Sequence, residues 1–254
     1  MKILRFKWKD QILWGQVDET NPHRVFPTKG PDGKRDAEHT AIPLSEIVRL
    51  PPAEPTKIIC VGRNYLDHIK EMGHATSELP KEPGVFLKGP NTLAAHEDTI
   101  LYPTWTQDLH FEGELALVIG TPGKHIRTRD ALDHILGYTC ALDLTARDRQ
   151  RSDLQWTRAK GSDQFCPLGP WLETDLDLER LEIQTRVNGI RKQHAWTDQM
   201  IFDIPTLVSY ISEFMTLERG DVILTGTPSG VGPLAARDKV EVEIEGIGCL
   251  RVAI

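Results

Sequence analysis

The chain has 254 residues and a mass of 28.6 kDa, enough for one large domain or for one domain with a small appendage. Hydrophobic residues make up 39% and charged residues 26%, the balance of a globular protein with a sizeable core. The net charge is −7 and no basic stripe is present, so nucleic-acid binding is not expected. No apolar run approaches the roughly 18 residues of a membrane span, so a membrane partner is not expected either.

The N-terminus and the cysteines bear on the cellular compartment. The opening residues, MKILRFKWKD, carry charges throughout, unlike a secretory signal peptide. Cys60, Cys140, Cys166 and Cys249 show no CxxC spacing and lie mostly in apolar runs. We therefore expect buried free thiols in a cytoplasmic protein.

The first part of the chain differs in pattern from the rest. Residues 1–17 alternate in places between apolar and polar side chains, as a β-hairpin does. A stretch rich in Pro, Gly and charged residues follows, and RLPPAEPTK at positions 49–57 has the composition of a linker. We expect a small β-rich N-terminal domain over residues 1–52 and a main domain over residues 53–254.

The main domain is expected to consist mostly of strands. A short helix is predicted between Asn64, a possible N-cap, and Gly73, a C-terminal stop. A longer helix is predicted over residues 203–215, with Asp203 as its cap, Pro205 in its first turn and one apolar stripe. Strands and helices do not alternate regularly, which argues against a doubly wound sheet or a (β/α)₈ barrel and for an α+β, mainly β fold. Apolar or alternating runs predict strands at 57–62, 84–89, 114–120, 137–143, 220–226, 239–246 and 249–254.

Three acidic residues stand at the ends of these strands. Glu112 and Glu114 are two residues apart at the start of an apolar strand, so their side chains share a face about 6.5 Å apart. Such a pair repels unless a positive group lies close to it. Asp143 ends another apolar strand, with no Cys or His beside it. If the strands meet, these three carboxylates suit a hard divalent cation such as Mg²⁺ or Mn²⁺.

Several basic and polar residues are candidates for the chemistry. His68 and Glu71 are three apart on the short helix and therefore share a face, where Glu71 could orient the imidazole as a base. The alternative, which an arbitrary helix would favour, is an exposed pair that contributes little to stability. Arg63 follows a strand and could hold a carboxylate, although a plain surface charge is an equal alternative. Lys160 could place a fixed positive charge near the metal to stabilise an enolate, or be an ordinary exposed lysine.

The segment TGTPSGVG at positions 225–232 contains Thr227 and backbone N–H groups that could form an anion-binding nest. It is not a P-loop, because no Lys-Ser/Thr pair follows the glycines. Ser229 does not lie in a GxSxG elbow, and no zinc-binding spacing is present. These patterns argue against a P-loop nucleotidase, a serine hydrolase and a zinc enzyme.

Taken together, these motifs resemble the fumarylacetoacetate hydrolase family. The resemblance covers roughly residues 57–250 and runs in order through KIICVGRNYLDHIKEMG, GVFLKGPNTL, HFEGELALVIG, GYTCALDLTARDRQ, AKGSDQFCPLGPWL, VNG and TLERGDVILTGTPSGVG. It implies a mixed β-sandwich or roll with few helices, preceded by the small N-terminal domain, and usually a homodimer.

The resemblance also implies roles for individual residues. One Mg²⁺ or Mn²⁺ would be held by Glu112, Glu114 and Asp143, with Lys160 as the family's active-site lysine. His68 and Glu71 would form a catalytic dyad on a lid helix. The remaining positions would line the substrate pocket, although Arg147 could only brace the site: Arg63, Lys88, Arg147, Gln150 and Thr227.

A 2-oxo acid substrate fits this site, because cleavage one carbon beyond the keto group leaves an enolate that a metal and a lysine stabilise. We expect hydrolysis of an acylpyruvate or fumarylpyruvate first. An oxaloacetate-type decarboxylase or tautomerase comes second, and a 2-hydroxyhepta-2,4-diene-1,7-dioate isomerase third. Two rivals from other classes are a non-catalytic binding protein with a structural cation and a glycosidase that uses Glu112 and Glu114.

Overall fold

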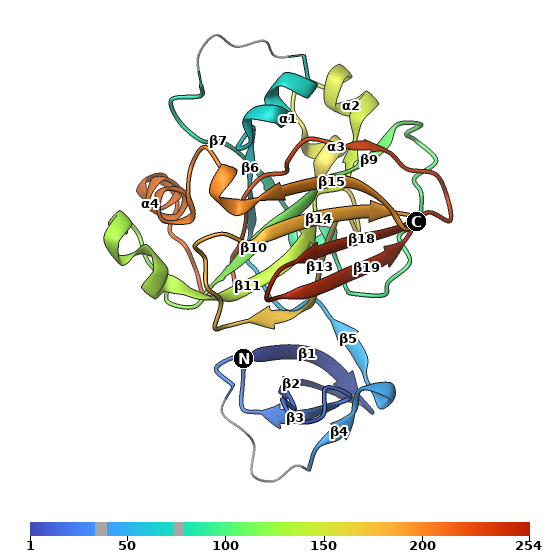
Figure 1. The fold of residues 1–254 in the computed structure, drawn as a ribbon, viewed down its shortest axis with the longest axis vertical. Coiled ribbons are helices and arrows are strands. Elements are labelled where there is room, and N and C mark those ends of the chain that lie inside the picture. Colours follow the sequence, from blue (N-terminus) through green and yellow to red (C-terminus); the bar gives the residue numbers. More distant parts are fainter. Residues whose placement is uncertain (34–39, 74–78) are drawn as a thin grey trace.

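The computed structural model describes residues 1–33, 40–73 and 79–254. Strands dominate it and the helices are few and short, as Figure 1 shows. The expected mainly β fold is therefore confirmed. Within the described residues, no helix is both long enough and apolar enough to cross a membrane.

The largest sheet runs through both ends of the molecule and is mainly antiparallel. In spatial order its strands are β4 (Ile42–Pro43), β3 (Arg24–Thr28), β2 (Gln11–Val17), β1 (Lys2–Trp8), β13 (Cys166–Glu173), β11 (Ile135–Leu142), β10 (Gly113–Ile119), β16 (Val222–Leu224), β6 (Ile58–Gly62) and β7 (Gly84–Lys88). β16 pairs in parallel with β6, and β8 (Leu93–Ala94) in parallel with β13, while β5 (Val48–Leu50) pairs with β1. The central strands are mainly apolar because both of their faces are covered, and every residue of β10 is buried.

A second, four-stranded antiparallel sheet packs on this one. Its strands are β15 (Ile190–Trp196), β14 (Glu182–Val187), β18 (Lys239–Ile244) and β19 (Gly248–Ala253), in that spatial order. β18 alternates buried valines and Ile244 with more exposed residues, as a half-covered strand does. Leu117 of the large sheet lies in the same apolar cluster as Ile183 and Val242 of the small one. The core is therefore the layer between two sheets (Figure 1).

A third, small sheet lies near one end of the core. It consists of β12 (Thr145–Ala146), β9 (Leu109–Phe111) and β17 (Gly232–Pro233). Because β9 leads into β10 and β12 follows β11, this sheet continues the pairing of the two central strands beyond their ends.

The helices follow the sequence signals with one exception. α4 (Ile204–Phe214) begins after Asp203, whose side chain accepts the Thr206 N–H at 2.9 Å, and its apolar stripe is buried as predicted. α1 (Leu66–Glu71) ends before Gly73, which has φ +74°, as a C-terminal stop requires. Asn64 does not cap α1. Instead its buried amide bonds to backbone groups of Phe202 and Thr225, so tertiary contacts take the place of capping.

The remaining helical segments are single turns or little more. α2 (Arg147–Ser152) and α3 (Thr157–Lys160) follow β12 in the chain. The described residues also contain four 3₁₀ turns: Leu44–Glu46, Pro90–Thr92, Thr128–His134 and Thr197–Gln199.

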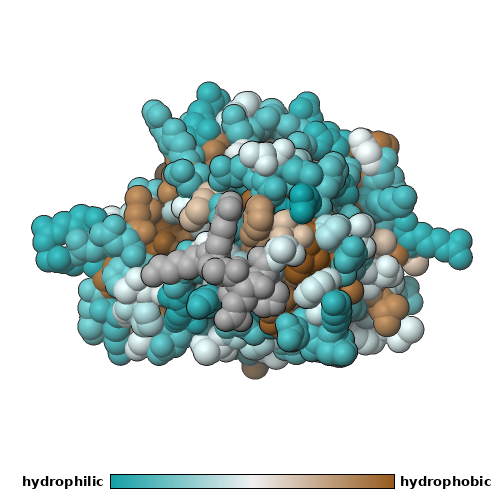
Figure 2. Space-filling model, turned by 90° about the horizontal axis from the view of Figure 1, so that it is seen from below, coloured by the Kyte–Doolittle hydropathy of each residue, from teal (hydrophilic) through white to brown (hydrophobic). Residues whose placement is uncertain are grey.

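The N-terminal strands form a separate end of the molecule in Figure 1. They enclose their own small apolar cluster, which includes Leu4, Phe6 and Val25. β1 nevertheless pairs with β13, with Ile3 opposite Leu172. Seen from below, the molecule is mainly hydrophilic, and hydrophobic residues show in two areas near its middle (Figure 2). A domain boundary at residue 52 stays a prediction, consistent with this separate cluster.

The cysteines are all free. Cys60, Cys140 and Cys166 are buried and Cys249 is half-buried, so the expected free thiols are confirmed and most of them are buried.

Candidate functional site

Three carboxylates meet where β10 and β11 pair. Gly113 lies opposite Leu142, so Glu112 and Asp143 are neighbours, and the Asp143 N–H donates to the Glu112 carbonyl oxygen at 2.9 Å. Side-chain oxygens of Glu112, Glu114 and Asp143 lie within 4.8 Å of one another, and all three residues are buried. The convergence expected from the strand ends is confirmed.

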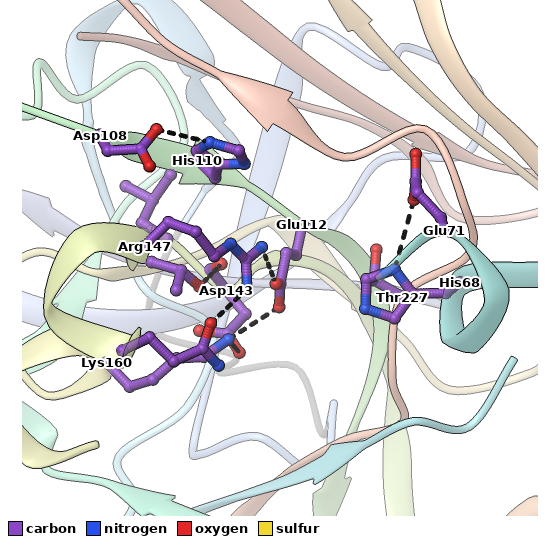
Figure 3. A network of polar contacts seen from close by, with 12 residues as sticks. His68, Glu71, Asp108, His110, Glu112, Asp143, Arg147, Lys160 and Thr227 are labelled. Carbon is purple, nitrogen blue, oxygen red and sulfur yellow. Dashed lines mark hydrogen bonds and ion pairs between the residues drawn. The ribbon is translucent and has the colours of Figure 1, made fainter. Parts of the chain in front are cut away.

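Two buried cations contact Glu112, and one of them also contacts Asp143 (Figure 3). The Lys160 ammonium, at the end of α3, donates to Glu112 Oε2 at 2.8 Å and to Asp143 Oδ2 at 2.6 Å. The Arg147 guanidinium, at the start of α2, donates to Glu112 Oε1 at 2.5 Å and to Gln150 Oε1 at 2.6 Å. These are the positive groups that close carboxylates require, and the alternative of Lys160 as an exposed surface residue is wrong.

The local charges drive the pKa values of the acids apart. Burial alone would raise the pKa of Glu112, but Lys160 and Arg147 hold it well below its usual range. Burial, Asp143 and Glu112 raise the pKa of Glu114 well above its usual range. Burial would lower the pKa of Lys160, yet Asp143 and Glu112 raise it, so the ammonium form persists. Without a further cation, Glu114 is the carboxyl group that takes up a proton.

Lys88 is placed differently from the expectation that it contacts substrate. It is fully buried behind Asp143 and is absent from the residues that line the cavity. Its ammonium lies 2.7 Å from Asp143 Oδ1 and donates to the carbonyl oxygens of Lys160 and Phe165 at 2.5 and 2.9 Å. Because the N–H donors of Lys88 are directed at protein groups, this residue supports Asp143 and Lys160 from outside the cavity lining.

The donor set fits Mg²⁺ or Mn²⁺. All three candidate ligands offer oxygen, the preferred ligand of these hard cations. Asp143 Oδ1 is buried and accepts no hydrogen bond from the described residues, so it keeps lone pairs for a cation beyond the ion pair with Lys88. Glu112, Glu114 and Asp143 would hold the metal, and it would supply charge stabilisation for an oxyanion.

The predicted dyad lies on the other side of Glu112 from Lys160 in Figure 3. His68 Nδ1 is 3.5 Å from Glu71 Oε2, at the limit of a hydrogen bond. Both carboxylate oxygens of Glu71 accept from the Gly230 N–H, at 3.1 and 3.0 Å. Glu71 thus has a fixed position from which it can orient the imidazole.

His68 is suited to accept a proton. Burial lowers its pKa and Arg147 lowers it further, while Glu112 and Glu71 only partly oppose this. The imidazole is therefore neutral at neutral pH, and its Nε2 is the atom left for a substrate or water.

One cavity of about 390 Å³ joins the carboxylates to His68. It brings together the predicted residues Arg63, His68, Glu112, Glu114, Asp143, Arg147, Gln150, Lys160 and Thr227. Glu71 lies outside the lining and acts behind His68, as an orienting group would. Seven further residues line the cavity that no sequence pattern had indicated: Val61, Gly62, Ile69, Met72, Phe86, Arg151 and Trp156. Phe86 and Trp156 meet edge to face and give the cavity an apolar wall, a contact that no sequence pattern indicates.

The segment after β16 runs beside β10 and is held by it. The Thr225 N–H donates to Leu115 O at 3.0 Å, the Gly226 N–H to Glu114 Oε2 at 2.6 Å, and the Thr227 hydroxyl to Gly113 O at 2.8 Å. The expected anion-binding nest is therefore used in part by the protein's own carboxylates, those of Glu114 and Glu71.

His110 and Arg151 extend the polar network beyond the predicted residues. Asp108 contacts His110 Nε2 at 2.8 Å and Arg151 Nη2 at 2.7 Å (Figure 3 labels the first two). His110 shares the strand parity of Glu112 and Glu114, a signal that could have indicated its position beside the site.

Comparisons with known proteins find similar sequences and similar folds among enzymes. Oxaloacetate tautomerase YisK of Bacillus subtilis is 44% identical over 220 residues, which cover 82% of this chain and 73% of that protein. The crystal structure of 5-carboxymethyl-2-hydroxymuconate delta-isomerase from Mycobacterium smegmatis matches with a TM-score of 0.91 and 40% identity, covering 100% of this chain and 98% of that one. Fumarylpyruvate hydrolase from Pseudomonas aeruginosa, in complex with Mn²⁺ and pyruvate, matches with a TM-score of 0.74 and 32% identity, covering 81% and 91%.

The family match covers most of the chain. Residues 57–254 match the fumarylacetoacetate (FAA) hydrolase C-terminal family, and the matched region contains every residue of the site described above. The chain belongs to the fumarylacetoacetate hydrolase family.

Proposed function

We propose that this protein is a divalent-metal-dependent enzyme that acts on 2-oxo dicarboxylic acids through an enolate. The leading candidate reaction is keto–enol tautomerisation or decarboxylation of an oxaloacetate-type substrate. The observation that carries the proposal is the cluster of three buried carboxylates and Lys160 in one cavity with a neutral His68. The tautomerase relative is 44% identical and the hydrolase relative 32%, which moves the oxaloacetate reactions ahead of acylpyruvate hydrolysis.

The charge of the site supports a dianionic substrate. Three buried acids, Glu112, Glu114 and Asp143, face three buried bases, Lys88, Arg147 and Lys160. With all three carboxylates ionised, as they would be around a bound metal, the six side chains sum to zero, so a divalent cation leaves about two positive charges. A 2-oxo acid with two carboxylates, or with one carboxylate and an enolate, matches that charge.

Each group of the chain has a defined task in this reaction. Arg63 and Gln150 line the cavity and carry N–H groups that would donate to substrate carboxylate oxygens. Thr227 lines it too, but its hydroxyl already donates to Gly113 O, so it would shape the cavity and not bind a carboxylate. His68 Nε2 removes a proton from the carbon next to the keto group, and Glu71 steadies the imidazolium that results. Lys160 keeps a positive charge beside the enolate oxygen, and the imidazolium then gives its proton to that oxygen, which completes the enol. In decarboxylation the bond from the same carbon to the distal carboxylate breaks instead. CO₂ leaves, and the shorter enolate that remains is protonated at carbon.

Hydrolysis of an acylpyruvate is a second candidate, favoured by the His68–Glu71 pair. In that reaction His68 takes a proton from water, and the hydroxide adds to the distal carbonyl carbon. The bond between this carbon and its neighbour then breaks, leaving a carboxylic acid and a pyruvate enolate that is protonated by the imidazolium. The 2-hydroxyhepta-2,4-diene-1,7-dioate isomerase reaction needs no water and breaks no C–C bond: the 2-hydroxyl group loses its proton to give a dienolate, which is then protonated at a carbon further along the chain.

A substrate panel tests these proposals. Oxaloacetate, acetylpyruvate, fumarylpyruvate and a 2-hydroxy-dienedioate are assayed with Mg²⁺ or Mn²⁺ and with EDTA, against blanks that contain the same metal and the Glu114→Gln variant. We expect turnover to be fastest with oxaloacetate and to stop with EDTA. His68→Ala should reduce hydrolysis at least as strongly as tautomerisation. Turnover that survives chelation would overturn the metal dependence, and a loss of melting temperature in EDTA without turnover of any substrate would support the non-catalytic rival.

The glycosidase alternative is not proposed further, because the chain belongs to a family with a different chemistry. We keep a reducing cytoplasm as the proposed compartment, supported by four cysteines that are all free.

A further inference from the structure

A buried amide in the second sheet contacts both halves of the site. Gln193 lies on β15 and is only 1% exposed. Its Oε1 accepts the Gly113 N–H at 2.9 Å, and its Nε2 donates to Thr227 Oγ1 and to Pro228 O, both at 2.8 Å. Both amide protons and the amide oxygen are therefore used, which fixes the orientation of the side chain.

Gly113 is the residue through which Gln193 reaches the carboxylates. It stands between Glu112 and Glu114, so any shift of its peptide groups moves both side chains. Its N–H is held by Gln193 and its carbonyl by the Thr227 hydroxyl at 2.8 Å. A Cβ added at Gly113 would lie 2.0 Å from Thr185 Oγ1 on β14, so the second sheet is pressed directly against this position.

The segment from Gly226 to Gly230 is the other partner. Its N–H groups hold Glu114 at one end and Glu71 at the other. A Cβ at Gly230 would lie 2.1 Å from Lys192 O, so this segment also packs closely on β15. Through its two donated hydrogen bonds, Gln193 links β15 to the segment that also positions the dyad.

We propose that Gln193 is a positioning residue that fixes the spacing between the carboxylate cluster and the His68–Glu71 dyad. It lies outside the cavity lining and acts only through Gly113, Thr227 and Pro228. The part of this inference that concerns the dyad rests on the proposed function, while the part that concerns the carboxylates does not. Groups behind metal ligands typically change metal affinity or activity by about 10 to 100-fold when they are removed.

Two variants distinguish the contact with Gly113 from the contacts with Thr227 and Pro228. Gln193→Met fills a similar volume but removes all three hydrogen bonds. We expect it to raise the Kd for Mn²⁺, measured by electron paramagnetic resonance, by about 10-fold, and to lower kcat at saturating Mn²⁺. Gln193→Glu keeps an acceptor for the Gly113 N–H and loses the donors to Thr227 and Pro228. We expect it to bind Mn²⁺ at least as tightly as the wild type and to lower kcat nonetheless.

Ser212→Ala is the matched control. This buried hydroxyl on α4 accepts the Ile126 N–H and donates to Ser209 O, at 2.9 and 2.8 Å, and it lies outside the cavity lining. Its loss should lower the melting temperature and leave the Mn²⁺ Kd, kcat and KM within about twofold. All proteins are compared at a temperature where circular dichroism shows them folded.

The proposal is overturned if both Gln193 variants keep the wild-type Kd, kcat and KM while only their melting temperatures fall. It is also overturned if Gln193→Met and Gln193→Glu weaken Mn²⁺ binding equally, because the contact with Gly113 would then not matter. A wild-type protein that binds Mn²⁺ but turns over no 2-oxo acid would defeat the proposed function and leave the Kd comparison intact.

Discussion

Lys160 occupies the gap between Glu112 and Asp143, with its ammonium 2.8 and 2.6 Å from their oxygens. This arrangement answers how three acids can stand together in a dry interior. In the proposed function the cluster has two tasks. The carboxylates would hold a cation, and the lysine would keep a positive charge beside the reacting oxygen.

Lys160→Met should separate these tasks. We expect turnover to fall by about 100-fold or more, because a charge next to the enolate is lost. The melting temperature in EDTA should also fall, since removing one partner leaves buried carboxylates uncompensated. Mn²⁺ should still bind and restore much of the lost melting temperature. Unchanged turnover in this variant would contradict the role given to the lysine, and a loss of Mn²⁺ binding would assign it to the metal site instead.

Some of these side chains could be placed from the sequence and others could not. Glu112 and Glu114 were predictable as a pair because strand alternation fixes their common face. The place of Lys88 was not, since nothing in a strand pattern tells whether a lysine at its end turns outward or donates to buried carbonyl groups. Gln193 stands in the polar run RKQHAW, where only the packing of the second sheet on Gly113 gives it a role.

Asp221 connects β16 and β6, the two strands that precede the site residues Thr227 and Arg63. It precedes β16, and its buried carboxylate accepts the N–H groups of Thr56 and Lys57 before β6, both at 3.1 Å. The Lys57 ammonium also pairs with it. Burial would raise the pKa of Asp221, but Lys57, the Glu218 N–H and Thr56 lower it. The contacts thereby fix the parallel pairing of β16 and β6, from whose ends Thr227 and Arg63 follow.

Asp221→Asn should therefore destabilise the protein by about 1–3 kcal/mol at pH 7. The lowered pKa means that this carboxylate adds stability above its ordinary value of 3.8 and that this stability is lost as the pH falls through the folded-state pKa. The difference between variant and wild type, measured by urea unfolding, should thus shrink as the pH falls below about 4. A constant difference between pH 7 and pH 3 would contradict this account.

The elements themselves were mostly predictable, while their neighbours were not. Apolar runs placed β6, β7, β10, β11 and β16, and Asp203 and Pro205 placed the start of α4. The order β11, β10, β16, β6 depends on pairing between residues far apart in the chain, which periodicity does not report. That order is what brings Thr227 beside Gly113. Asn64 shows the same limit, because its bonds to Phe202 and Thr225 arise only after the strands assemble.

At the scale of the whole molecule, the homodimer implied by the family resemblance stays a prediction. Large hydrophobic side chains are exposed at Leu101, Leu154 and Ile190. A dimer that covers such residues would remove their apolar surface from water. We predict that sedimentation equilibrium at micromolar concentration gives about twice the chain mass of 28.6 kDa. A mass equal to one chain across the accessible range of concentration would contradict this prediction.

The central claim is that Glu112, Glu114 and Asp143 jointly bind one divalent cation. Crystals grown with Mn²⁺ and measured on both sides of the manganese absorption edge test it most directly. The account predicts one anomalous peak per chain, bounded by oxygens of these three side chains and facing the cavity that holds His68 and Lys160. A peak elsewhere, or well-ordered carboxylates with no peak between them at millimolar Mn²⁺, would contradict it.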